Sequence, residues 1–423
     1  MLAIGIAQTD ITPTASVWLT GYGNRDHKSE GVYQGLRAGA VYLHHDNEEI
    51  LLLTADHIGY DSTYAALAKA AIGVATGLSP RQIVLTATHT HCGPFFTPWC
   101  MPGEIEHEYA RQLQQQLVHL AIEAQHKAVP GQLRFSRTSC PFGVNRRLPD
   151  GQGGILFAPN PDGPMDRDLD TLWFSDQGGR PLGSLSIFGC HPTSLGGYLI
   201  GGDYPGFLTR AVAAETGAPA LFATGCAGNI RPWFKDDNNG FGRPSYDELG
   251  QAGAAIGAQV LATQNGARTI EPALQATATF HPLPYADRPS RDELTDCAAG
   301  DENLLKRRWA QSMLELVDAG GLPGACPQEI QLIQLGPDLR AVFLGGEVLA
   351  EIGLHIKKAL GPGQTIAAAY SNGLIAYIPG QETYDLGGYE VDGSHPYFLR
   401  PAPFAKNAES LIVATTRRLA AGL

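Results

Sequence analysis

The chain has 423 residues, of which 43% are hydrophobic and 17% are charged, and this composition excludes a disordered or fibrous protein. Its formal net charge of −12 argues against a nucleic-acid-binding protein, which needs a basic surface to contact phosphates. The length fits either one large domain or two smaller ones. The 51 glycines and 29 prolines predict many tight turns.

The N-terminal segment and the cysteines bear on the cellular compartment. Residues 1–8 (MLAIGIAQ) lack a basic region, a long apolar run and a small-residue cleavage site, so we expect neither a secretory signal nor a transmembrane span. Seven cysteines cannot all pair, and their spacing shows no disulfide framework and no C-x-x-C unit. These features predict a cytoplasmic location without membrane insertion.

Apolar runs alternate with helical patterns along the chain. In the first half, strands are expected over 49–55, 82–88, 171–175, 183–189 and 220–224, and helices over 64–75, 106–127 and 205–215. In the second half, a polar excursion over 286–326 precedes a strand over 339–344, a helix over 348–360, a strand over 365–370 and a helix over 405–419. Strands that alternate with helices predict an α/β fold, and no linker separates two domains.

His89-Thr90-His91 stands where the strand over 82–88 gives way to Cys92-Gly93-Pro94. In an extended chain, residues two apart point the same way, so both imidazoles would project together from the strand end. Ligand crevices of open α/β sheets lie outside the carboxyl ends of their strands. The alternative interpretation is a pair of hydrogen-bonded histidines in a turn.

Two further strands end in residues that could bind a metal. His191 follows the apolar strand over 183–189, although a single buried histidine is more often hydrogen-bonded than a ligand. Glu347 follows the strand over 339–344 and two glycines; it could bind zinc or complement a helix N-terminus, worth about 0.5 kcal/mol. Catalytic zinc takes three protein ligands and leaves one position for water, so the recurrence of such residues indicates a zinc hydrolase.

The other candidate residues favour structural roles. Asp56-His57 also ends a strand and could support the ligands or belong to them; we favour a structural or supporting role. A Gly-x-Ser-x-Gly motif is absent, so a serine hydrolase of the nucleophile-elbow type has little support.

The chain resembles the neutral (alkaline, non-lysosomal) ceramidase family in a series of short motifs that occur in the family's order along nearly the whole sequence. These motifs are Thr9–Pro13 (TDITP), Thr88–Pro94 (THTHCGP), Asn145-Arg146, Asp166-Arg167, His191–Ser194 (HPTS), Gly346-Glu347, and Tyr377 within Ile375–Ile378 (IAYI). The resemblance implies an α/β fold over residues 1–423, with one large catalytic domain of mixed β-sheets flanked by helices.

The resemblance also implies roles for individual residues. His89, His191, Glu347 and Tyr377 match the family's ligands to one zinc ion. His91 matches the histidine beside the metal that handles substrate or protons, and Arg146 matches an arginine that faces the scissile group and could stabilise a developing oxyanion. Tyr377 would not be selected without the family, because tyrosine is an unusual zinc ligand.

Three departures separate this chain from the family's pattern. The family has a serine in a Gly-Asp-Val-Ser-Pro stretch, and here Gly228–Pro232 reads GNIRP, so Arg231 occupies the serine's place. We expect neither the family's additional C-terminal β-sandwich domain nor a signal sequence in this protein. A serine-acyl mechanism and ceramide itself are therefore disfavoured, whereas water activated by zinc remains compatible with the sequence.

The sequence thus predicts a zinc-dependent hydrolase of an amide (N-acyl) bond in a small-molecule substrate more polar than ceramide, with Arg231 binding substrate. The first alternative is an esterase or lactonase that acts on a small polar acid with the same metal site. The second is a non-catalytic binding protein of the same fold, which the intact set of ligands disfavours.

Overall fold

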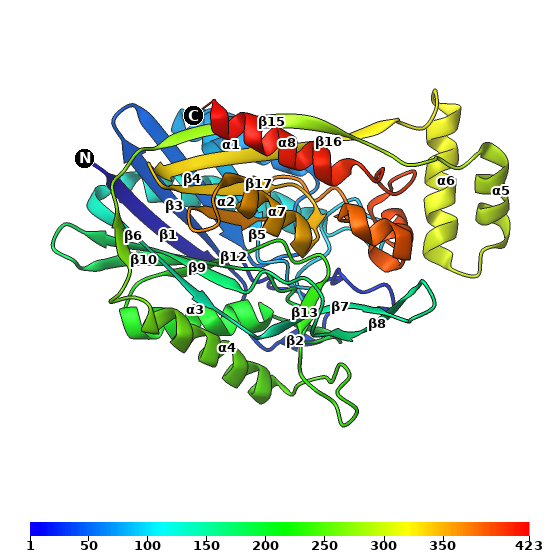
Figure 1. Cartoon of the computed structure of the whole chain (residues 1–423), viewed down its shortest axis with the longest axis horizontal. Coiled ribbons are helices and arrows are strands. Elements are labelled where there is room, and N and C mark those ends of the chain that lie inside the picture. The colour runs from blue at the N-terminus through cyan, green and yellow to red at the C-terminus, as the bar shows by residue number, and fades with distance from the viewer. Residues whose placement is uncertain (423) are drawn as a thin grey trace.

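The computed structural model describes residues 1–422, and its centre consists of two β-sheets packed face to face (Figure 1). The larger sheet has the strand order β12-β10-β9-β6-β1-β3-β4-β5, with β14 paired to β6. Its strands are β1 (Ala3–Asp10), β3 (Arg37–His45), β4 (Glu48–Ala55), β5 (Ile83–Ala87), β6 (Val129–Ser139), β9 (Asp168–Asp176), β10 (Pro181–Phe188), β12 (Ala220–Thr224) and β14 (Arg268–Ile270).

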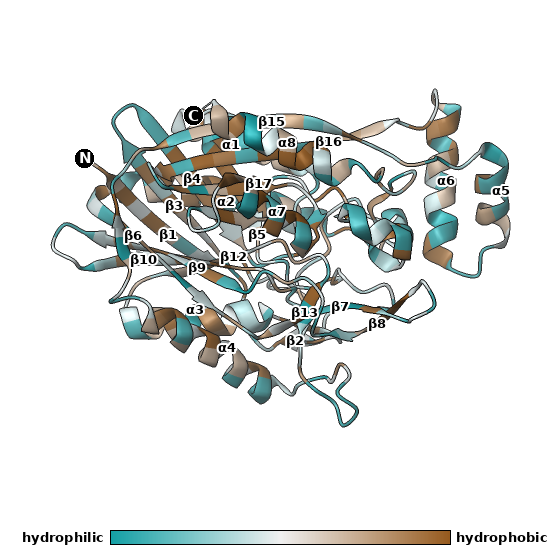
Figure 2. Cartoon of the chain, in the orientation of Figure 1, coloured by the Kyte–Doolittle hydropathy of each residue, from teal (hydrophilic) through white to brown (hydrophobic). Residues whose placement is uncertain are grey.

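The second sheet has the strand order β15-β16-β17-β19. These strands are β15 (Gln275–Pro284), β16 (Ala325–Gly336), β17 (Leu339–Leu344) and β19 (Thr365–Ala368). Side chains such as Leu335 and Phe343 share a buried core with Val41 and Phe174 of the larger sheet. Because both faces of the central strands are covered, they carry continuous apolar runs, and Figure 2 shows strong hydrophobic colour on β1, β3 and β4.

Helices cover the outer faces of both sheets. On the larger sheet, α1 (Ser62–Thr76) and α2 (His107–His126) form a core with β1, β3, β4 and β5, and α3 (Asp203–Thr216) and α4 (Tyr246–Ala262) form another with β10 and β12. On the second sheet lie α7 (Ala350–Leu360) and α8 (Ala408–Ala421). The remaining pair, α5 (Arg291–Gly300) and α6 (Leu304–Asp318), forms a hairpin at one end of the molecule (Figure 1).

Short elements connect these layers near the strand ends. They are the pair β2 (Gly31–Val32) and β11 (Leu199–Ile200); the sheet of β13 (Ile230–Pro232), β7 (Gly143–Pro149) and β8 (Ile155–Asn160); the parallel pair β18 (Glu347–Val348) and β20 (Tyr377–Ile378); the 3₁₀ turns η1 (Pro80–Gln82), η2 (Gln381–Leu386) and η4 (His395–Phe398); and the single π-helical turn η3 (Tyr389–Gly393). Short elements and irregular segments therefore follow the carboxyl ends of several strands in both sheets.

The predicted α/β class with mixed sheets and flanking helices is confirmed. The predicted elements agree with the structure to within a few residues at their ends, and the excursion over 286–326 contains the helical hairpin. Two local predictions differ. The last part of the strand expected over 82–88 is loop after Ala87, and the helix expected from Val348 begins at Ala350, because Glu347 and Val348 form the short strand β18.

Candidate metal centre and active site

The carboxyl ends of three strands from both sheets meet at one place. His89 follows β5, His191 follows β10 and Glu347 follows β17. The larger sheet curls so that β5 and β12 approach each other, and the Thr224 hydroxyl donates a hydrogen bond to the carbonyl of Thr88 at 2.7 Å. The connection after β19 joins the second sheet to this point, because the N–H of Ala369 donates to the carbonyl of Thr224 and the N–H of Tyr370 to that of Gly346.

His89 and His91 converge by a different route from the one their spacing predicts. The chain is not extended at His89, which has the left-handed φ of 63°. The ring is fixed instead by a hydrogen bond from its Nδ1 to the carbonyl of Ile58, and that of His91 by one to the carbonyl of Gly21 at 3.0 Å. A strained backbone that persists at such a position is typical of a functional site.

Three of the predicted site residues place a ligand atom close to the Nε2 of His191, and His91 joins the group through His89. The Nε2 of His191 lies 3.1 Å from the Nε2 of His89, 3.0 Å from the Oε2 of Glu347 and 3.3 Å from the hydroxyl of Tyr377. The Nε2 of His89 lies 3.3 Å from Glu347 and 3.3 Å from the Nε2 of His91. The three histidines form a buried group in which all ligand atoms lie within 4.8 Å of one another.

The protonation pattern of this cluster fits a bound cation. Each imidazole donates its Nδ1–H to a main-chain carbonyl, namely those of Ile58, Ala227 and Gly21. Each Nε2 therefore presents a lone pair, and neither the three Nε2 atoms nor the Glu347 carboxylate can donate a proton to one another; the Tyr377 hydroxyl is the donor that lies beside them. Ligand atoms about 2.1 Å from a tetrahedral zinc lie about 3.4 Å apart, which is close to the spacings of 3.0 to 3.3 Å in this cluster.

The surroundings of this cluster lower the pKa values of His91, His191 and Glu347. Burial lowers the pKa of His191 to about 4, and burial together with the other histidines lowers the pKa of His91 well below its ordinary value. Burial alone would raise the pKa of Glu347, but His89 and His191 hold it well below its ordinary value. Neutral imidazoles and an ionised carboxylate are the protonation states that a metal ion requires of its ligands.

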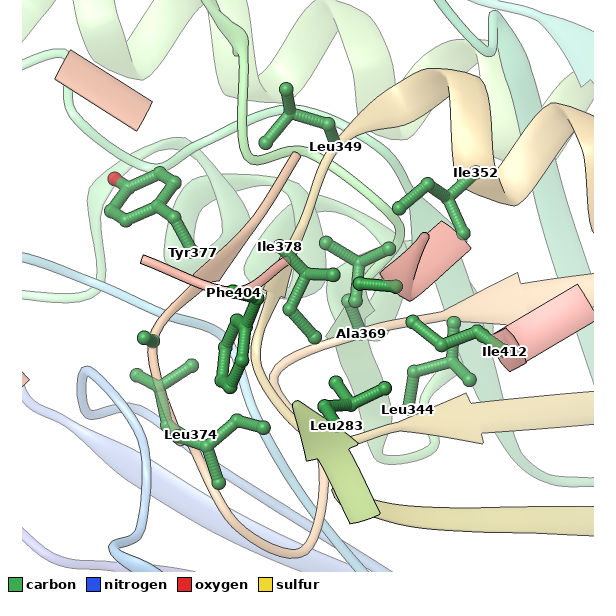
Figure 3. Packing of buried hydrophobic residues seen from close by; sticks show 14 of the residues in the cluster. Leu283, Leu344, Leu349, Ile352, Ala369, Leu374, Tyr377, Ile378, Phe404 and Ile412 are labelled. Carbon is green, nitrogen blue, oxygen red and sulfur yellow. The ribbon is translucent and has the colours of Figure 1, made fainter. Parts of the chain in front are cut away.

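Glu347 and Tyr377 are brought together by the pairing of β18 with β20. These two residues are direct partners in the parallel register, and the N–H of Glu347 donates to the carbonyl of Ala376 at 2.8 Å. Gly346 before them has a φ of 109°, and a Cβ there would lie 2.8 Å from Ile378. Figure 3 shows Tyr377 at the edge of an apolar cluster with its hydroxyl directed away from the other labelled side chains.

Arg146 contacts this centre and is oriented by a residue that the sequence reasoning missed. Its Nη2 lies 3.2 Å from the Tyr377 hydroxyl, and its Nε donates to Glu390 at 2.7 Å. Glu390 also accepts from Arg147 at 2.6 Å, so one buried carboxylate holds two guanidinium groups. Glu390 lies in η3, and no sequence motif marks it.

A second missed residue is Tyr370, which supports two of the histidines. Its ring centroid lies 4.1 Å from that of His89, and its hydroxyl lies 3.3 Å from the Nδ1 of His191. Its φ of 53° is a second left-handed position next to the centre. Tyr370 contacts rings from distant parts of the chain, and no local sequence pattern marks it. Its role is therefore visible only in the structure.

Asp56 and His57 lie behind the centre and support its loop. The carboxylate of Asp56 accepts from the N–H of Arg37 at 2.8 Å, and the Nδ1 of His57 accepts from the N–H of Gly59 at 2.9 Å. Between them and His89, the carbonyl of Ile58 binds the His89 ring. These contacts agree with the structural or supporting role favoured from the sequence.

A cavity of about 640 Å³ adjoins the centre, and Arg231 lines it. The lining includes Tyr22, whose ring centroid lies 5.0 Å from that of His91, and Thr193, which is two residues beyond His191. The Nη2 of Arg231 contacts the carbonyl of Thr193 at 3.3 Å. The structure thus places Arg231 beside the cavity rather than within the cluster of ligand atoms.

Comparisons with known proteins agree with the motifs. Residues 2–218 match the family described as neutral/alkaline non-lysosomal ceramidase, N-terminal. The structure is similar to that of neutral ceramidase from Pseudomonas aeruginosa, with a TM-score of 0.77 and 20% identity over 100% of this chain and 75% of that one. It is also similar to a structure described as ceramidase complexed with C2, with a TM-score of 0.76 and 19% identity over 100% of this chain and 76% of that one.

No curated protein matches the chain. The family match covers just over half of the sequence and contains the motifs around His89, Arg146 and His191. The structural likeness extends the same fold over the remainder, where Glu347 and Tyr377 lie. The chain therefore belongs to the neutral/alkaline non-lysosomal ceramidase family.

Proposed function

We propose that the protein is a zinc-dependent hydrolase that cleaves an amide (N-acyl) bond. Membership of a ceramidase family supports a hydrolase of this kind. The observation that carries the metal assignment is the convergence of three Nε2 lone pairs and a carboxylate, none of which can donate a proton to another. A bound zinc ion polarises a carbonyl group and makes hydroxide available at neutral pH.

The ligands in this proposal are His89, His191, Glu347 and Tyr377. Glu347 and Tyr377 each lie close to the Nε2 of His191, whereas the contact of His91 within the cluster is to His89. That arrangement leaves His91 as the base: it donates its Nδ1–H to Gly21, so its Nε2 can accept a proton from the attacking water and return it to the leaving amine.

Arg146 is proposed to bind the oxygen of the scissile carbonyl. Its Nη2 is directed toward the centre at the Tyr377 hydroxyl, while Glu390 fixes its Nε. A guanidinium held in this way stabilises the negative charge that develops on the carbonyl oxygen during attack. Glu390 acts through Arg146 and is a positioning residue.

We further propose that residues 1–423 work as one catalytic domain. The ligands come from strands of both sheets, because His89 and His191 follow strands of the larger sheet and Glu347 follows β17 of the second. Neither sheet alone contains the proposed set.

The location proposed is the cytoplasm. All seven cysteines are free thiols, and a reducing compartment keeps thiols in this state. Within residues 1–422, no helix has the length and apolar character needed to cross a membrane. Fractionation that recovers the native protein mainly outside the cell would contradict the assignment.

The first experiment is metal analysis of the purified protein, followed by assays on matched amides, esters and lactones. We expect one zinc ion per chain, and loss of that ion in His191→Ala and in Glu347→Gln. His355→Ala is the matched control, because that imidazole is 52% exposed and lies outside the cluster. Preferred cleavage of esters or lactones would favour the first alternative, and binding without cleavage would favour a non-catalytic protein.

A further inference from the structure

The cavity beside the centre has an unusual charge for a protein with a net charge of −12. Arg25, Arg231 and Arg243 line it, and its lining contains no aspartate or glutamate. Among residues 1–422, none of these three arginines forms an ion pair with a carboxylate. The lining thus carries three cationic groups without an ion-pair partner in that range, and the buried carboxylate of Asp203 accepts hydrogen bonds from Ser194 of the lining.

The three arginines differ in what they can offer a ligand. Arg25 is buried, and its donors are directed to the carbonyls of Thr20, His91 and Gly197, so it holds the surrounding loops. Arg243 is exposed at the rim of the cavity. Arg231 is largely enclosed, and it still has donors that form no hydrogen bond within residues 1–422.

The environment of Arg231 favours an anion. Its guanidinium lies 4.4 Å from the ring centroid of Phe241 and 5.5 Å from that of Phe157. Its hydrogen bond to Thr193 is long at 3.3 Å, and its Nε is buried without a partner. A largely buried guanidinium with an unsatisfied donor costs free energy, and an anionic ligand that contacts its outer nitrogens would offset part of that cost.

Some other enclosed arginines of the chain bind a carboxylate. Arg146 and Arg147 share Glu390 at 2.7 and 2.6 Å, and Arg137 binds Asp170 through two of its nitrogens. Arg231 has no carboxylate partner in the described part of the chain, and it lies at the wall of a cavity next to the proposed metal centre.

We propose that the cavity binds a single carboxylate of the substrate through Arg231, so that the enzyme acts on N-acyl compounds that carry a free carboxylate near the scissile amide. The inference rests on the proposed function, because it assigns the substrate class of that same site. A carboxylate fits better than a phosphate dianion, since one enclosed guanidinium with free donors matches one negative charge. The volume of about 640 Å³ suits a small ligand.

Binding is tested separately from hydrolysis with two ketones that lack the scissile N-acyl bond. 4-Oxononanoic acid has the shape of N-hexanoylglycine with a methylene group in place of the amide nitrogen, and 4-oxononanamide is its neutral counterpart. Calorimetry with the metal-loaded protein should give tighter binding of the acid by roughly 10- to 100-fold, as for a charge-assisted bidentate contact. N-hexanoylglycine and N-hexanoylglycinamide are then compared as substrates by kcat/KM.

Variants assign the preference to Arg231. In Arg231→Gln, the ratio of the two affinities should fall below about 3-fold, and Arg231→Lys should give an intermediate ratio because lysine retains the charge without the planar fork. Arg268→Gln is the control, since Arg268 lies on the surface with Asp338 and away from the cavity. If Arg231→Gln does not fold, the Arg231→Lys ratio decides: a value equal to that of the parent protein overturns the proposal.

The outcomes separate this inference from the proposed function. A preference for the acid that Arg231→Gln abolishes, without hydrolysis of either amide, would support the carboxylate site and reject the hydrolase. Hydrolysis of both amides with equal kcat/KM, and equal binding of both ketones, would support the hydrolase and overturn the carboxylate site. A preference that survives in Arg231→Gln would also overturn it, because the carboxylate would then bind elsewhere.

Discussion

Glu390 neutralises two buried arginines, and its replacement by glutamine should destabilise the protein strongly. Its side chain is 2% exposed, and those of Arg146 and Arg147 are 6% and 5% exposed. Burial would raise the pKa of Glu390, but the two arginines hold it below its ordinary value, so the carboxylate is ionised in the folded protein. Glu390→Gln keeps the shape of the side chain and removes the charge, which leaves two guanidinium groups buried without a counterion.

The magnitude follows from the cost of breaking a buried ion pair, about 3–5 kcal/mol. A chain of 423 residues has an unfolding entropy of about 0.9 kcal/mol/K, so this loss corresponds to a decrease in Tm of about 3–6 °C. Differential scanning calorimetry and urea titration of the variant against the parent protein measure the two quantities independently.

Asp385→Asn is the control for this experiment. Asp385 also lies in the C-terminal segment and pairs with Lys406 at 2.6 Å, but the two side chains are 75% and 48% exposed. Its Tm should change by less than about 1 °C, because exposed pairs contribute little. If the free energy of unfolding of Glu390→Gln lies within about 1 kcal/mol of that of the parent protein, the buried carboxylate does not hold the two arginines as described.

Three further predictions concern the metal centre and its surroundings. Tyr370→Phe keeps the ring against His89 and removes the hydroxyl near His191, so zinc affinity should fall by about 10-fold in a competition titration with a chelator, while Tm stays nearly constant. Removal of zinc by a chelator should lower Tm by about 4–5 °C when free zinc had been at about 1,000 times its dissociation constant, and added zinc should restore it. Burial lowers the pKa of His57 to about 3, so the stability gained from its neutral ring is present above pH 6.5 and is lost as the pH falls toward 3. The parent protein should therefore lose about 3 kcal/mol more of its unfolding free energy between pH 7 and pH 4 than His57→Asn, whose amide oxygen can still accept from the N–H of Gly59.

Each of these predictions has an outcome that contradicts it. Unchanged zinc affinity in Tyr370→Phe would mean that the hydrogen bond of His191 to Ala227 alone orients that ring. If neither the chelator nor added zinc changes the Tm, the folded protein does not bind this metal. Equal pH profiles of stability for His57→Asn and the parent protein would mean that His57 is not kept neutral by burial. Burial raises the pKa of Asp56 to about 6, but Asp56 is present in both proteins, so its contribution cancels in the difference between the two profiles.

The class of the fold and three of the four proposed ligands could be predicted from the sequence, because both predictions depend on signals that are local in the chain. Apolar runs bounded by turns located strands such as β12 and β17 to within a residue, and His89, His191 and Glu347 stand directly after such runs. Tyr377 and Arg146 were identified through short motifs shared with the family, which encode contacts that residue spacing does not.

The way in which the proposed site residues come together depends on the tertiary structure. His89 is placed by a left-handed turn and the carbonyl of Ile58, and Glu347 by the pairing of β18 with β20, so neither the extended strand nor the helix start expected locally positions them. Glu390 and Tyr370 carry no local signal, because each acts through a partner far away in sequence. Such contacts depend on how the two sheets pack, and hydrophobic periodicity, which reports only the face that each element buries, does not contain that information.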